Sequence, residues 1–307
     1  MISLRTAMSL LAAVSLSFLL ISGNVVWAGE ATAKAAPAVD EQVKESTDQQ
    51  TAEKRKQILE EATGAIRETQ NALQALDKED GEAALAALER AAGKLEIILA
   101  REPELALAPA GVNTVTYDVL ASIEAIERVR ESAEDALADG RLQEARRLID
   151  DLASETVISV TNVPLATYPD AIRLSVGLID KGDLDAAADV LQTALNTLVV
   201  TDAIIPLPVA AARQLLRDAQ ELAAKEDRSE DEVEQLKEHL QAARHELEFA
   251  DALGYGSERD FASLYEQLDN LEDRVDQGDS GKGFFAKVQE LLNDTIESSQ
   301  PDANERT

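Results

Sequence analysis

Cysteine is absent from this sequence of 307 residues, and aromatic residues make up only 3% of it. Without cysteine the chain has no disulfide, no thiolate nucleophile, no cysteine-ligated metal and no lipid-anchored cysteine. Basic residues are also scarce, because 29 Lys and Arg stand against 59 Asp and Glu, for a net charge of −30. This acidity argues against nucleic acid and anionic membranes as partners, since both attract clusters of Lys and Arg.

Alanine and leucine supply much of the apolar share. Hydrophobic residues reach 45% and charged residues 29%, a balance typical of folded proteins. Alanine and leucine both favour helices, because they lose little entropy there and carry no β-branch. The composition therefore predicts an all-α fold: an irregular helical bundle of antiparallel helical hairpins, with one short two-stranded β ribbon as an option.

The first 28 residues have the pattern of a secretory signal peptide. Arg5 precedes an apolar stretch over 7–21, and the small residues Val26 and Ala28 form a cleavage site, which predicts cleavage after Ala28. The alternative is an uncleaved anchor, but the apolar run is short for a membrane span. We therefore expect a periplasmic protein without stable membrane insertion, and without tryptophan, because Trp27 is removed.

The remaining chain divides by composition. Residues 29–50 contain few large apolar side chains and are interpreted as a flexible linker. Residues 51–256 form the main helical domain, and residues 257–307 an acidic helical extension with a loosely attached, flexible tail. Apolar spacing of three to four residues predicts helices over 51–76, over 85–99, and over 117–138, 141–154, 169–180, 183–200, 207–226, 230–253, 257–276 and 284–297.

Local signals refine this picture. Ser229 and Glu232 form a capping box at the start of one predicted helix. Gly140 and Gly182 are each followed by the same apolar spacing, so we expect both to adopt a left-handed conformation at a hairpin corner, with a weaker copy at Gly81. Their unequal separations argue against a tetratricopeptide array. Two β-branched pieces could pair as the ribbon: 112–116 and 157–161.

No arrangement of residues identifies a reaction. His239 and His245 lie six apart on one predicted helix, roughly 120° apart around its axis, so they cannot share a metal there and are expected to face solvent. The segment 276–281 loosely resembles a calcium loop but lacks key ligands. Carboxylate pairs are too frequent for any one to stand out. We therefore expect no catalysis, no cofactor and no metal, with an unrecognised carboxylate-based hydrolase or lyase as a weaker alternative.

Two proline loops are the candidate site for a ligand or client protein. Both place proline beside leucine at a predicted helix start, where proline is well tolerated. Two interpretations remain open: helix starts with apolar residues in the core, or a rigid apolar lip at one end of the bundle. The residues concerned are Val163, Pro164, Leu165, Tyr168, Ile205, Pro206, Leu207 and Pro208.

These loops and their surroundings resemble the YfdX family of bacterial stress-associated proteins, over roughly 55–256. The resemblance implies a mostly helical exported protein linked to acid stress, envelope stress or drug tolerance, with chaperone-like or small-molecule-binding behaviour. It implies no catalytic residues. The similar segments are VPLATYP at 163–169, Lys181 with Gly182, LQTALNTLVVTD at 191–202, IPLPV at 205–209, the hairpin over 117–152 and LGYG at 253–256.

Together these observations predict an exported stress-response protein that acts by binding client proteins or apolar small molecules. Its negative surface would keep client complexes dispersed, and acid would discharge that surface. The alternative is a scaffold for a specific envelope partner. A homo-oligomer is also an open alternative, and a saline habitat would explain the acidity without any partner.

Overall fold

Helices dominate the structure, and three strands form one antiparallel sheet between them. The computed structural model of the chain describes residues 29–278 and 282–298, so the predicted signal peptide lies outside the described residues. The expected mostly helical fold with a short β element is confirmed. The elements are α1 (Gly29–Lys56), α2 (Glu60–Leu76), α3 (Gly81–Arg101), β1 (Leu107–Tyr117), α4 (Ile123–Ala138), α5 (Leu142–Ile149), β2 (Glu155–Pro164), α6 (Tyr168–Ile179), α7 (Leu184–Asn196), β3 (Val199–Pro206), α8 (Leu207–Ala223), α9 (Glu230–Leu253), α10 (Glu258–Asp276) and α11 (Lys282–Ser298).

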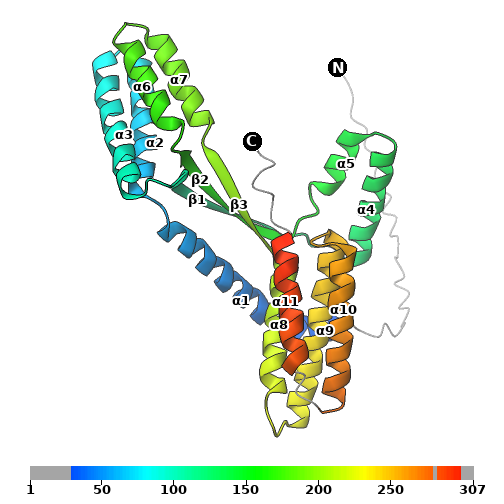
Figure 1. Ribbon diagram of the computed structural model, residues 1–307. Helices are drawn as coiled ribbons and strands as arrows, with labels where there is room; N and C mark the ends of the chain where they lie inside the picture. The colour runs from blue at the N-terminus through cyan, green and yellow to red at the C-terminus, as the bar shows by residue number, and fades with distance from the viewer. Residues whose placement is uncertain (1–28, 279–281, 299–307) are drawn as a thin grey trace, which may run out of the picture.

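Helices α2, α3, α6 and α7 form the first bundle, at one end of the molecule (Figure 1). Its core is built largely from alanine and leucine, which fits the composition of the sequence. Buried alanines such as Ala65, Ala84 and Ala187 leave room for neighbouring helices to approach closely. The predicted hairpins α2–α3 and α6–α7 therefore pack against each other around one core.

The glycine corners are confirmed at two of the three predicted positions. Gly140 and Gly182 have φ angles of 74° and 80°, which only glycine adopts without strain. At the weaker copy the left-handed residue is Glu79, with φ of 59°, rather than Gly81. Gly81 instead starts α3, where an added Cβ would lie 3.3 Å from Ile179.

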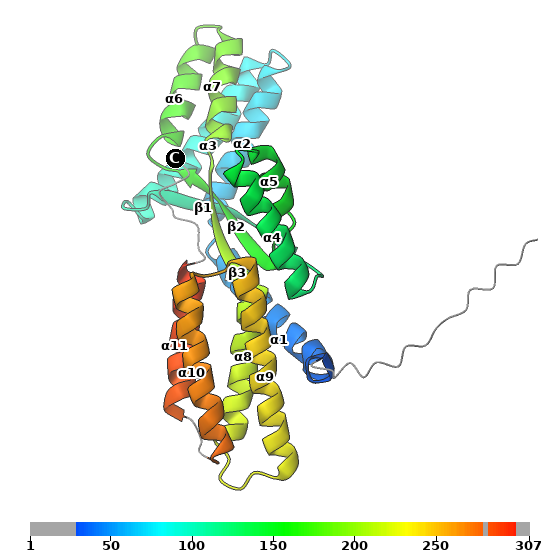
Figure 2. The same cartoon turned by 90° about the vertical axis from the view of Figure 1, so that its right-hand side faces the viewer.

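The sheet has the order β1-β2-β3 and connects the first bundle to a second one (Figures 1 and 2). The predicted pieces 112–116 and 157–161 do pair antiparallel, with Val112 opposite Val160. The third strand was not predicted, because Val199 continued the apolar spacing of the preceding helix. That helix ends at Asn196, and the β-branched residues after it pair with the other edge of β2.

Helices α8, α9, α10 and α11 form the second bundle, and α1 crosses it obliquely, with Val39 and Val43 in its core (Figure 1). The predicted boundary at residue 257 does not separate two cores, since Leu240 and Leu268 on either side of it belong to one cluster. The predicted loose attachment of the last helix is also wrong. Phe285 and Leu292 on α11 are fully buried in the same core, so hydrophobic burial fixes this helix.

The predicted flexible linker over 29–50 is helical in the structure, as part of α1. The sequence did not reveal the buried stripe of this helix, because the stripe consists of two valines and two threonines rather than large apolar residues. Val39, Val43, Thr47 and Thr51 recur every four residues and are all buried. The single helix expected over 51–76 is divided between α1 and α2.

Helices α4 and α5 form a hairpin that stands apart from the first bundle (Figure 1). It is tied to the second bundle through Arg130, whose Nη1 donates to the backbone oxygens of Asp251 and Ala252 at 3.3 and 3.2 Å. These carbonyls belong to the end of α9, where a cation is favourable.

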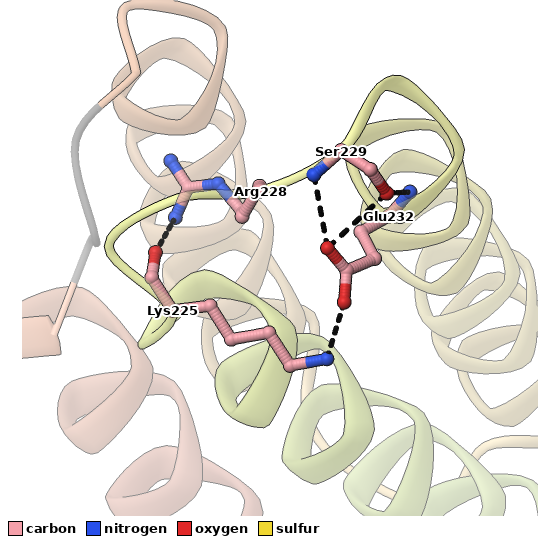
Figure 3. A network of polar contacts seen from close by, with 4 residues as sticks. All are labelled: Lys225, Arg228, Ser229 and Glu232. Atoms are coloured by element: carbon pink, nitrogen blue, oxygen red, sulfur yellow. Dashed lines mark hydrogen bonds and ion pairs between the residues drawn. The ribbon is translucent and has the colours of Figure 1, made fainter.

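The turn between α8 and α9 contains the predicted capping box (Figure 3). The backbone nitrogen of Ser229 donates to Glu232 Oε2 at 2.9 Å, and that of Glu232 donates to Ser229 Oγ at 3.3 Å. Lys225 also contacts Glu232, and these bonds lower the pKa of Glu232 to about 2. Arg228 closes the turn by donating to the backbone oxygens of α8 residue Ala223 and of Lys225.

Candidate functional site

The two predicted proline loops do not meet, so the expected apolar lip at one end of the bundle is wrong. Pro164 ends β2 opposite Leu107, whereas Pro206 ends β3 opposite Glu155 at the start of β2. Because β2 and β3 are antiparallel, Pro164 and Pro206 lie at opposite ends of the strands. With ten residues in β2, at about 3.3 Å per residue the loops lie about 30 Å apart.

The first loop is structural. Val163, Leu165 and Tyr168 are buried in the core of the first bundle, and Pro164 is partly exposed. The backbone nitrogen of Leu165 donates to the oxygen of Ala106 at 3.0 Å, which fixes the loop. Here the alternative that the sequence left open, a helix start with apolar residues in the core, describes the structure.

The second loop lies at a cavity of about 680 Å³ between α1, the sheet, α8 and α9. Leu207 and Pro208 contribute to its wall, whereas Ile205 and Pro206 are buried beside it. The backbone nitrogen of Leu207 donates to the oxygen of Ser154 at 2.9 Å, which joins α8 to the start of β2. We call this the acidic cavity; it is lined by Asp40, Val43, Lys44, Thr47, Asp48, Thr114, Thr116, Asp118, Ser154, Thr156, Leu207, Pro208, Ala211, His245, Glu246 and Phe249.

Hydroxyl groups from β1 and β2 form one wall of the acidic cavity. Side chains two apart on a strand share a face, which brings Thr114 and Thr116 together. Thr116 Oγ1 and Thr156 Oγ1 lie 2.9 Å apart across the two strands. Ser154 Oγ donates to Asp118 Oδ1 at 2.9 Å. The bond from Ser154 orients the Asp118 carboxylate at the cavity.

Tyr255 supports this wall from behind. The backbone nitrogen of Ser154 donates to Tyr255 Oη at 2.8 Å. Burial raises the pKa of Tyr255, so its hydroxyl stays neutral. The Leu253–Gly254–Tyr255 segment thereby links the end of α9 to the start of β2.

Carboxylates dominate the charge of the cavity. Burial raises the pKa of Glu246 to about 7, and the negative charges of Asp40 and Asp118 add to the effect. Asp48 is a fourth carboxylate in the lining, against the single ammonium of Lys44. The site is therefore negative at neutral pH, and it gains a proton at Glu246 as the pH falls below about 7.

The two histidines have different surroundings. His245 is exposed at the acidic cavity, as predicted, but His239 is partly buried and its expected exposure is wrong. Nδ1 of His239 is buried and forms no hydrogen bond with the residues that the structure describes. Within 29–278 and 282–298, no three His, Asp or Glu side chains form a group that could hold a metal ion.

No helix in those ranges is long and apolar enough to cross a membrane.

The cavity joins residues that sequence reasoning did not connect. Asp40 and Glu246 are far apart in the sequence, and each sits in a helix rich in charge. The one usable signal was the alternation of threonine at 114, 116 and 156, which marks polar faces of two paired strands.

Comparison with known proteins supports the family resemblance. Residues 65–204 match the family described as YfdX protein. Residues 65–204 are a YfdX family region. The matched region runs from α2 to β3 and is narrower than the expected 55–256, so IPLPV at 205–209 lies just beyond its end.

The structure is also similar to that of Salmonella Typhi YfdX, with 13% sequence identity and a TM-score of 0.34. The similarity covers 49% of this chain and 93% of the other. No curated protein matches the sequence. The family region supplies the sheet side of the acidic cavity, whereas α1, α8 and α9 lie outside it.

Proposed function

We propose that this protein is an exported stress-response protein that acts by binding, and that its ligand is a small apolar molecule carrying a positive charge. The observation that supports this proposal is the acidic cavity, whose volume of about 680 Å³ suits a small organic molecule. The site binds without catalysing a reaction.

The lining accounts for both parts of such a ligand. Val43, Leu207 and Phe249 offer apolar contact, while Asp118 and Glu246 offer negative charge to a protonated amine. A partly buried carboxylate attracts a cation more strongly than an exposed one, because less water screens it. A hydrophobic amine therefore fits the cavity better than a neutral or anionic molecule of the same size.

Binding should depend on pH through Glu246. Its pKa of about 7 leaves it mostly charged at pH 8 and mostly neutral at pH 6, so affinity for a hydrophobic amine rises with pH. Asp40, Lys44, Asp48, Asp118 and His245 also line the cavity. A His245→Gln variant separates the contribution of that imidazole from the contribution of Glu246.

A fluorescence titration with a hydrophobic amine dye tests the proposal. We expect Glu246→Gln and Leu207→Ser to weaken binding at pH 8 by about tenfold, the loss of about 1.4 kcal/mol. Leu174→Ser is the matched control, because Leu174 is exposed on α6 and does not line the acidic cavity. Unchanged affinity in the first two variants, or equal affinity for an anionic dye, would contradict this function.

Client holding is a second candidate, which the α4–α5 hairpin favours. Leu137, Leu142 and Ile149 on this hairpin are about half exposed, at 52%, 61% and 48%. Light scattering of an aggregating client, at neutral and acidic pH, tests this function with all three residues changed to serine. Suppression that is lost in the variant supports client holding, and one stoichiometric partner in a pull-down supports a scaffold instead.

The hydrolase or lyase alternative would rest on Glu246, because a carboxyl group with pKa near 7 suits general acid–base catalysis. Turnover of an ester or glycoside panel that is abolished by Glu246→Gln would establish this alternative and contradict our proposal.

Export is tested separately, by sequencing the mature N-terminus from a periplasmic extract. We expect that terminus to be Gly29.

A further inference from the structure

A second cavity lies between α1, β3, α8 and α11, with a volume of about 380 Å³. Its charged lining is basic: Lys54 from α1, and Arg213 and Arg217 from α8. No Asp or Glu is among its described lining residues, although acidic residues outnumber basic ones two to one in the sequence. We call this the basic cavity.

Among the residues that the structure describes, these three cations have no acidic partner. Arg213 is partly buried, and its Nη2 donates to the neutral Oδ1 of Asn293 on α11 at 2.6 Å. Among the described residues, no carboxylate lies within ion-pair distance of Lys54, Arg213 or Arg217. By contrast, Arg244 on α9 contacts both Asp269 and Glu272.

The two arginines also oppose each other. They are four residues apart on α8, on neighbouring turns of one helix face. Burial lowers the pKa of Arg213, and the like charge of Arg217 lowers it further. Two carboxylates of α8 lie near this row. Asp218 accepts a hydrogen bond from Gln214 at 2.9 Å, and Glu221, four residues after Arg217, forms no ion pair with it among the described residues. A partly buried guanidinium beside a second one is unfavourable unless an anion neutralises them.

Neutral groups complete the lining. Gln42, Ser46 and Gln50 project from one row of α1, at intervals of four residues, and can donate to an oxygen-rich ligand. Ile204 and Ile205 from β3 provide an apolar wall. The cavity is large enough for an anionic group and a small organic body.

We propose that the basic cavity binds a small phosphorylated molecule, with its phosphate between Lys54, Arg213 and Arg217 and its organic part against Ile204 and Ile205. Guanidinium groups match phosphate oxygens in pairs, and three positive charges more than neutralise the two negative charges of a phosphate monoester. Four of the five residues, all but Ile204, lie outside the region that matches the YfdX family. The proposal is independent of the proposed amine site, whose charge is opposite.

The test is calorimetric titration of the full chain with inorganic phosphate, phenyl phosphate and benzoate at constant ionic strength. We expect phenyl phosphate to bind more tightly than inorganic phosphate, and benzoate to bind at least tenfold more weakly than phenyl phosphate. Equal affinity for the two phosphates would assign the site to free phosphate and overturn the organic part of the proposal. Benzoate binding as tight as phenyl phosphate would overturn the phosphate part.

Variants locate the site. Arg217→Gln should weaken phenyl phosphate binding by about tenfold or more, because it removes a charged hydrogen-bond donor. Arg217 is exposed and makes no hydrogen bond or ion pair within the described residues, so this variant keeps the fold even if Arg213→Gln does not. Arg147→Gln is the matched control, since Arg147 is an exposed helix arginine on α5.

Absence of saturable binding to either phosphate at millimolar concentration would overturn the proposal. So would an equal loss in Arg147→Gln and Arg217→Gln, because it would indicate general attraction to the surface. A matched thermal scan with sodium chloride controls for screening of the large negative charge, which stabilises an acidic protein without any site. Stabilisation by chloride equal to that by phenyl phosphate contradicts a specific site.

Discussion

The two cavities share one helix but have opposite charges. Val43 and Thr47 on α1 contribute to both. The row containing Asp40 and Asp48 belongs to the acidic cavity, whereas Lys54 belongs to the basic one. In a chain with a net charge of −30, an acidic cavity needs no special explanation. A cavity lined by basic residues is not expected from this composition, so the basic cavity says more about its ligand than the acidic cavity does.

Helix α1 lies between the two cavities and lines both of them. Its buried stripe packs on the second bundle, and the rows on either side of the stripe supply the polar lining of each cavity. A segment that composition alone assigns to a flexible linker thus forms a wall of both sites.

Among the variants that test the two cavities, Phe285→Ala is expected to have the largest effect on stability. Phe285 is fully buried in the second bundle, so its truncation should lower the free energy of unfolding by about 3–5 kcal/mol. Urea unfolding measures the loss, with Leu142→Ala on the exposed hairpin as control. Helix α11 carries Asn293, which contacts Arg213 in the basic cavity. In the molecules that remain folded, the affinity for phosphate should therefore fall more than the affinity for an amine. A loss below about 1 kcal/mol would mean that α11 contributes little to the core.

The next effect concerns the proton on Glu246. The pKa of Glu246 is about 7 in the folded chain, against 4.5 for an ordinary glutamate. Between pH 4.5 and pH 7, Glu246 is therefore protonated in the folded state and ionised in the unfolded state. Stability therefore falls as the pH rises from 4.5 to 7. Glu246→Gln should stabilise the protein at pH 8 by about 2 kcal/mol, and by almost nothing at pH 4.

Urea unfolding at both pH values checks this prediction. Glu234→Gln, on an exposed position of the same helix, is the matched control. Equal stability of the Glu246→Gln variant and the parent protein at pH 8 would show that Glu246 is not buried as the acidic cavity requires.

The smallest effect is expected in the basic cavity. Arg217→Gln removes a like-charge pair four residues apart on a helix, so the protein without ligand should gain about 0.3 kcal/mol. The same variant should lose the stabilisation that phenyl phosphate gives the parent protein. Thermal unfolding with and without phenyl phosphate measures both changes. A variant that is less stable than its parent without ligand would contradict the unfavourable pairing of Arg213 with Arg217.

Local features of the fold could be predicted from sequence, and long-range ones could not. The limits 230–253 and the capping box at Ser229 follow from spacing and from a short motif, and the structure confirms them. The strand Val199–Pro206 was missed because Val199 and Val200 also continue the pattern of the preceding helix, and only pairing with β2 decides between the two. Tertiary contacts thus override a local preference.

The candidate site was predicted only in part, for the same reason. Leu207 and Pro208 do line a cavity, but Val163 and Tyr168 are core residues at the far end of β2. Proline beside leucine marks a helix start wherever it occurs, so the motif cannot tell a core from a cavity wall. The charged residues of both cavities come from separate elements, and no spacing in the sequence reveals their proximity.

The most direct test of the account is a crossed titration. The parent chain, Glu246→Gln and Arg217→Gln are each titrated at pH 8 with a hydrophobic amine dye and with phenyl phosphate. Our account predicts that Glu246→Gln weakens only the binding of the amine, and that Arg217→Gln weakens only the binding of the phosphate. If each variant weakened both ligands equally, or neither variant weakened any ligand, two separate sites of opposite charge would be contradicted.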